Sequence, residues 1–121
     1  MIRRILMIAT VAGTLGTAAC APATLFEWGN YESALYAYSQ NPENRQLYQE
    51  SLEVAIERGL ERGALAPGLM AELGYLHLEA GNTAEALRYF QEERSRFPES
   101  AKLMDRMIDG LSGTGAARGT N

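Results

Sequence analysis

Residues 67–100 have the sequence PGLMAELGYLHLEAGNTAEALRYFQEERSRFPES, and its spacing predicts two helices joined by a tight turn. Pro67 is expected to open the first helix, which carries apolar side chains at helical intervals and is ended by Gly81. The next four residues, Asn82-Thr83-Ala84-Glu85, resemble a capping box with Asn in the Ser/Thr place, and start the second helix. Pro98 is typical of the start of a further helix. The segment therefore predicts a helical hairpin followed by another helix.

This hairpin resembles one tetratricopeptide repeat, a helix–turn–helix unit of about 34 residues. Leu73-Gly74 matches the Leu-Gly pair of the repeat, and Ala86 and Phe90 match positions on its second helix. Small residues such as Gly74 and Ala86 let two helices approach closely, and Phe90 fills the space between them. The hairpin departs from the repeat at three positions, where Met70 replaces the usual Trp, His77 the usual Tyr and Glu93 the usual Ala.

Other helices are expected upstream of this hairpin. One covers about residues 30–40, and a second starts at Asn41-Pro42-Glu43 and stops at Gly63. The pattern Gly29-Asn30…Ala34 repeats Gly81-Asn82…Ala86, so the helix at about 30–40 resembles the second half of a repeat. The chain contains no alternating apolar run long enough for a strand. We expect an all-α domain over residues 28–109, a short tetratricopeptide-like stack of about five helices, and a disordered Gly-rich tail over 110–121.

The N-terminal residues 1–19 have the parts of a lipoprotein signal peptide. Arg3 and Arg4 precede an uncharged apolar stretch that at about 1.5 Å per helical residue is too short for a membrane core of about 30 Å. Thr17-Ala18-Ala19-Cys20 resembles a bacterial lipobox, with Thr17 at the usual Leu position, which implies cleavage between Ala19 and Cys20 and lipid attachment to the Cys20 thiol. The alternative is an ordinary secretory cleavage that leaves a free Cys. In either case residues 20–27 are expected to form a tether.

The composition excludes several classes of protein. The chain has 121 residues, one Cys and one His, so it holds no disulfide framework and no multi-Cys or two-His metal motif. Its net charge of −4 becomes −6 when Arg3 and Arg4 leave with the signal peptide. We therefore expect no metal or cofactor, and no nucleic acid or anionic headgroup partner.

Three spaced motifs resemble a family of small proteobacterial lipoproteins known only as a domain of unknown function. The motifs are Leu25-Phe26-Glu27-Trp28-Gly29-Asn30-Tyr31-Glu32, Ala66-Pro67-Gly68-Leu69 and Phe97-Pro98-Glu99-Ser100. Genes of this family commonly lie beside one for a lipoprotein similar to the curli secretion channel. The resemblance implies that lipoprotein as a candidate partner. The residue after Cys20 is Ala21 and not Asp, which by resemblance to enterobacterial sorting rules favours the outer membrane, so we expect an anchor on its periplasmic face.

Three groups of side chains are candidates for binding a partner. The lone Trp28 could enter a partner's pocket or a membrane interface, or it could hold the tether against the first helices. By its repeat position Tyr75 is expected to face a concave groove, as are Ala71 and Glu79, and a rigid Tyr beside a carboxylate suits peptide binding. Four carboxylates are spaced so that they lie on one face of the helix expected to stop at Gly63. This face is either simply solvated or an acidic strip that docks a basic partner, and its residues are Glu50, Glu53, Glu57 and Glu61.

Catalysis has no support in the sequence. His77 lies inside an apolar helix without a Ser or Cys nucleophile in view, and is expected to be structural. We expect a non-enzymatic adaptor or accessory factor in an envelope assembly or export apparatus. The alternative is an envelope lipoprotein that binds lipid or peptidoglycan without a protein partner.

Overall fold

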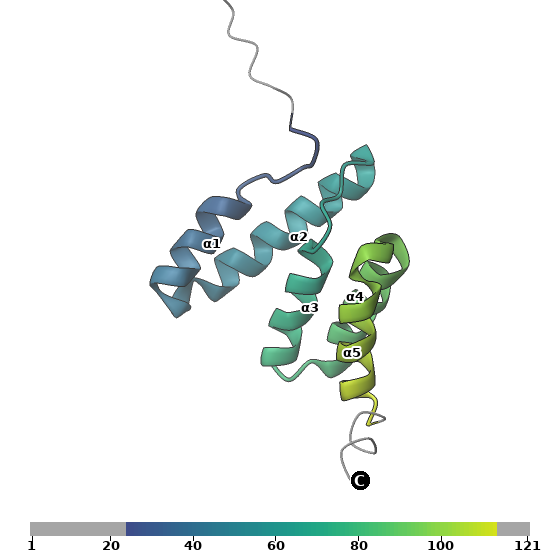
Figure 1. Cartoon of the computed structure of the whole chain (residues 1–121). Coiled ribbons are helices and arrows are strands. Elements are labelled where there is room, and N and C mark those ends of the chain that lie inside the picture. Colours follow the sequence, from purple (N-terminus) through teal and green to yellow (C-terminus); the bar gives the residue numbers. More distant parts are fainter. Residues whose placement is uncertain (1–23, 114–121) are drawn as a thin grey trace, which may run out of the picture.

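A computed structural model describes residues 24–113, and these residues form five α-helices without a strand (Figure 1). The helices are, in order, α1 (Tyr31–Gln40), α2 (Arg45–Arg62), α3 (Leu69–Glu79), α4 (Thr83–Arg96) and α5 (Ala101–Leu111). Each helix packs against the next one along the chain, so the expected all-α stack of hairpins is confirmed. Residues 1–23, which include the expected signal peptide and Cys20, and residues 114–121 lie outside the described residues.

Three helices begin later than proline placement predicts. Pro42–Asn44 and Pro98–Ser100 form single 3₁₀ turns, and α2 and α5 begin only after them. The prediction that α3 opens at Pro67 is wrong, because Gly68 has φ 97°, a left-handed conformation that no α-helix contains. The predicted stop of α2 at Gly63 is confirmed, since Gly63 caps the helix with φ 62°.

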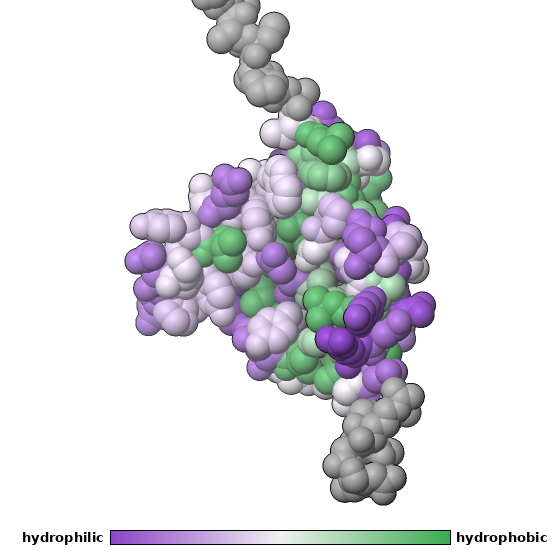
Figure 2. Space-filling view, viewed as in Figure 1, coloured by the Kyte–Doolittle hydropathy of each residue, from purple (hydrophilic) through white to green (hydrophobic). Residues whose placement is uncertain are grey.

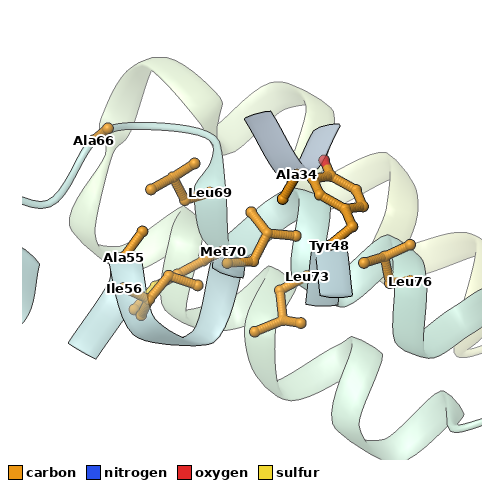
Figure 3. Packing of buried hydrophobic residues seen from close by; sticks show 10 residues of the cluster. Ala34, Tyr48, Ala55, Ile56, Ala66, Leu69, Met70, Leu73 and Leu76 are labelled. Atoms are coloured by element: carbon orange, nitrogen blue, oxygen red, sulfur yellow. The ribbon is translucent and has the colours of Figure 1, made fainter. Parts of the chain in front are cut away.

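Buried apolar side chains of α1, α2 and α3 form the larger of two core clusters (Figure 3). Side chains of α2 and α3 point toward one another, and Ala34 of α1 lies beside the Tyr48 ring. The smaller cluster joins α4 and α5 and contains Ala86, Phe90 and Met104. A methyl group added at Gly74 would lie 2.8 Å from Cε1 of Phe90, so Gly74 permits the close approach of α3 and α4 that the sequence predicted.

The similarity between the start of α1 and the start of α4 had a local cause. Ala34 and Ala86 are both buried small residues one turn inside a helix that follows Gly-Asn. In the structure, however, α1 begins a hairpin with α2, and it shares one face of the molecule with α3 and α5. The helix therefore occupies the first position of a repeat, and the expectation that it is a second half is wrong.

Both ends of the helical domain differ from their expected boundaries. Phe26 packs against the core, and the Glu27 N–H donates to the Ala64 carbonyl at 2.8 Å, so these two residues belong to the fold rather than to the tether. At the other end α5 continues to Leu111, which packs on the smaller cluster, instead of ending at residue 109. The apolar side chain of Leu111 accounts for the longer helix.

The predicted capping box at the start of α4 is also wrong in detail. Asn82 occupies the N-cap position of α4, but its side chain makes no capping hydrogen bond. Its backbone N–H instead donates to the His77 carbonyl at 2.9 Å, which closes the turn between α3 and α4.

Candidate partner-binding groove

An open apolar groove lies between α1, α3 and α5, with a cavity volume of about 440 Å³. Figure 2 shows this face of the molecule, with hydrophobic side chains interleaved with hydrophilic ones between α1 and α5. The lining residues are Leu35 and Tyr38 of α1, Tyr48 of α2, Ala71, Glu72, Tyr75, Leu76 and Glu79 of α3, Phe90 of α4, and Leu103, Met104 and Met107 of α5. The predicted positions Ala71, Tyr75 and Glu79 are therefore brought together on one surface.

The rim of the groove is formed by large apolar side chains that are exposed to solvent. Leu35, Tyr75 and Leu103 come from three different helices, and all three are exposed. Beneath them, Leu76 and Met104 are buried and form the floor. Exposed apolar side chains gathered around a concavity are typical of surfaces that bind a partner.

A cluster of two tyrosines and a carboxylate stiffens the α1 side of the groove. The Tyr31 hydroxyl donates to the Glu72 carboxylate at 2.9 Å from Oε1, and the Tyr48 hydroxyl also donates to Glu72. The Tyr38 and Tyr48 rings stack with their centroids 5.2 Å apart. Burial, with the hydrogen bond to Glu72 next in importance, raises the pKa of Tyr31 to about 12 and that of Tyr48 further above its ordinary value. The cluster ties α1 and α2 to α3 and fixes the groove's shape.

The charge in the groove has one sign. Glu72 and Glu79 line it, whereas none of the described residues that line it is Lys, Arg or His. Glu72 already accepts two tyrosine hydroxyls, but Glu79 is exposed in the last turn of α3. Glu79 is therefore the carboxylate that remains available to a cationic group of a ligand.

The acidic side chains of α2 lie on a surface separate from the groove. Glu50, Glu53, Glu57 and Glu61 are all exposed, and none of them lines the groove. Glu50 accepts a hydrogen bond from Gln46 at 2.8 Å, and Glu53 accepts one from Gln49 at 3.0 Å. Two of the four carboxylates are thus satisfied by amides of their own helix, as in a solvated helix face.

Trp28 packs inward rather than standing free. Its ring meets the Phe26 ring edge-on, with the two ring centroids 6.2 Å apart. The centroids of the Trp28 and Tyr31 rings are 5.6 Å apart. All three residues are partly buried against the larger core cluster. Among the alternatives for Trp28, the geometry favours the one in which it holds the N-terminal segment against the first helices.

His77 is half-buried and stacks on Tyr89 with ring centroids 5.5 Å apart, while the Arg88 guanidinium lies 4.1 Å from the centre of the same Tyr89 ring.

Within residues 24–113 no three His, Cys, Asp or Glu side chains are grouped to hold a metal ion. None of the helices in this part of the chain is both long and apolar enough to cross a membrane.

The sequence did not single out two carboxylates that hold helices together, the partly buried Glu72 and the fully buried Glu93. Glu72 could have been noticed as a charge within the apolar run of α3. Glu93, which had been noted only as a departure from the repeat, is fully buried and accepts hydrogen bonds from the Gly68 N–H and the Ser100 hydroxyl, each at 2.8 Å. Its other oxygen has no partner among the described residues. Glu93 thereby joins α4 to the starts of α3 and α5.

Comparison with known proteins gives one family. The model of a domain of unknown function, DUF4810, matches residues 25–107, which is most of the described chain. No curated protein and no solved structure gives a significant match.

Proposed function

The chain belongs to the DUF4810 family, and from its groove we propose that it is an outer-membrane lipoprotein acting as a non-enzymatic protein-interaction adaptor in an envelope assembly or export apparatus. The single observation that carries the proposal is the apolar groove with an exposed rim of Leu35, Tyr75 and Leu103. Exposing such side chains is costly for a protein that binds nothing, because their burial is worth about 25 cal/mol per Å² of apolar surface.

The rigidity of the groove also supports a binding role. Its walls are helices, and the hydrogen bonds from Tyr31 and Tyr48 to Glu72 hold three of them in register. A preformed site binds with less loss of conformational entropy than a flexible loop does. Peptides and amphipathic helices commonly bind to grooves of this kind.

The location and the partner in this proposal come from the sequence. The lipobox-like residues Thr17-Ala18-Ala19-Cys20 support a lipid anchor on Cys20, and Ala21 supports the periplasmic face of the outer membrane. The family resemblance supports a curli-channel-like lipoprotein as the partner, and the acidic net charge supports a protein rather than a nucleic acid ligand.

Capture of the tagged protein from its own envelope in mild detergent tests the proposal. We expect mass spectrometry to recover the curli-channel-like lipoprotein in stoichiometric amount with the native chain. Tyr75→Ala should weaken partner binding at least about tenfold, which corresponds to the loss of roughly 1.4 kcal/mol of binding free energy, and should therefore lower that recovery. Glu57→Gln, on the acidic face of α2, serves as the control and should leave recovery unchanged. Equal recovery with both variants would exclude the groove as the contact surface, and recovery of the chain alone under cross-linking would contradict the adaptor role.

A further inference from the structure

The end of the domain where the N-terminal segment enters carries apolar side chains that the groove does not use. Leu25 is 78% exposed, and Leu60 in the last turn of α2 is 40% exposed. Leu60 shares a shallow hollow with Leu65 and Phe97. Figure 2 shows hydrophobic side chains gathered at the top of the molecule, beside the grey N-terminal trace. Leu25, Leu60, Leu65 and Phe97 are called the entry face below.

The N-terminal segment is fixed at this same end. The Glu27 N–H donates to the carbonyl of Ala64 in the connection between α2 and α3, at 2.8 Å. The Glu27 carboxylate also forms an ion pair with Arg62 in the last turn of α2, at 2.6 Å. These contacts fix where the chain leaves the domain.

The length of chain between the entry face and the expected anchor is short. Four residues lie between Cys20 and Leu25, and the five steps along the chain, at about 3.3 Å each, span at most about 17 Å. A lipid on Cys20 would therefore keep Leu25 of the entry face within about 17 Å of the anchored thiol, close enough for the face to reach the headgroups. The end of α5 lies at the opposite end of the molecule in Figure 1.

We propose that the entry face rests on the lipid bilayer that holds the Cys20 anchor, with Leu25 and Leu60 at the level of the headgroups. The inference rests on the lipid anchor in the proposed function. Glu57 and Glu61 flank Leu60 on α2, and their charge keeps the contact shallow. Arg96 lines the same hollow, and its guanidinium can reach lipid phosphates while its stem covers apolar surface. The bound domain then stands with the end of α5 away from the membrane.

The chain offers a closely matched pair of positions for a test. Leu60 and Leu47 are the same residue type on the same helix, and they are 40% and 45% exposed. They are separated by about 20 Å along the axis at 1.5 Å rise per residue. Because Cys20 is the only Cys of the chain and its thiol is blocked when lipidated, Leu60→Cys or Leu47→Cys supplies the single site for a nitroxide spin label.

The full lipidated chain is placed in vesicles of phosphatidylethanolamine with a small fraction of phosphatidylglycerol. Label accessibility to oxygen and to a water-soluble nickel chelate is compared with that in the soluble Cys20→Ser form of each variant. We expect nickel accessibility at position 60 to fall at least twofold on the vesicles, and that at position 47 to stay the same. A chain that floats with the vesicles while position 60 remains as accessible as in the soluble form overturns the entry face alone. A chain that does not float with the vesicles overturns the anchor and the entry face together.

Discussion

Gly74 determines how closely α3 and α4 pack. A Cβ at this position would lie 2.8 Å and 2.9 Å from two carbon atoms of the Phe90 ring and 3.1 Å from Cβ of Tyr89. Phe90 is 1% exposed, so its ring can move away from position 74 only by displacing side chains that pack around it. The residue type at position 74 is thus dictated by a contact with the next helix and not by its own helix.

The change Gly74→Ala is expected to destabilise the fold. Overpacking lowers the free energy of unfolding by about 1–3 kcal/mol, and the better helix propensity of Ala offsets at most about 1 kcal/mol of that loss. A net loss of about 1 kcal/mol lowers the melting temperature of a domain this size by about 4–8 °C, which calorimetry can measure. Gly110→Ala is the matched control, because nothing lies within 4 Å of a Cβ at that position of α5. A Gly74→Ala protein as stable as the Gly110→Ala protein would contradict the close packing.

The hydroxyls that contact Glu72 make the stability of the fold depend on pH at the alkaline end. The ordinary pKa of Tyr is 10.0, and in the fold that of Tyr31 is raised to about 12. Between these values the folded chain holds a proton that the unfolded chain has released, so the free energy of unfolding falls as pH rises. Stability from this source is present below pH 10.0 and is lost as pH passes through about 12.

We expect urea unfolding to show this loss as a steeper decline above pH 10 for the native chain than for Tyr31→Phe. The Phe variant loses the hydrogen bond at neutral pH but no longer titrates at this position. Tyr36→Phe, which alters an exposed residue of α1, provides the control and should decline like the native chain. Parallel curves for the native chain and Tyr31→Phe would show that the hydroxyl is not held by Glu72.

At the scale of the helices, the sequence predicts the number and order of elements because Pro and Gly mark nearly every boundary. The errors of one to three residues arise where a local signal allows two outcomes. Pro42 and Pro98 each start a 3₁₀ turn before the α-helix, and Gly68 delays α3 by adopting a left-handed conformation. Propensity alone does not distinguish these outcomes, because the geometry of each turn depends on where the neighbouring helix packs.

Glu93 connects three helices through a single carboxylate, so we expect Glu93→Ala to destabilise the domain. The change leaves the Gly68 N–H and the Ser100 hydroxyl without their acceptor, and a buried polar group without a partner costs about 1–3 kcal/mol, so we expect a net loss of about 1–2 kcal/mol. Chemical denaturation measures the loss. Glu93→Gln retains an oxygen for the Gly68 N–H and the Ser100 hydroxyl and should lose less. Greater stability for Glu93→Ala than for the native chain would contradict this role.

At the scale of the whole molecule, the central wall of the groove could be predicted and its outer walls could not. The positions of Tyr75 and Glu79 follow from the register of one repeat within α3. Leu35 and Leu103 join them only because α1 and α5 stack on either side of α3, which local sequence does not encode. Tyr31 and Glu72 are likewise 41 residues apart in sequence, and no local pattern relates them.

The proposed lipid anchor on Cys20 makes its own prediction for the intact protein. Cys20→Ser should move the chain from the membrane fraction to the soluble periplasm, because a thiol is needed to accept the lipid that holds it to the membrane. Circular dichroism should show unchanged helical content, since the helical domain begins well after residue 20. Retention of the Cys20→Ser chain in the membrane fraction would contradict a lipid anchor at this residue.

The groove as the contact surface is tested most directly by photocross-linking in the native envelope. A photoreactive phenylalanine analogue is placed at Tyr75 on the rim of the groove, and in a second strain at Glu57 on the acidic face of α2. We predict that irradiation joins the chain to the curli-channel-like lipoprotein from position 75 and not from position 57. Cross-links to that lipoprotein from position 57 alone, or from neither position, would contradict a partner bound in the groove.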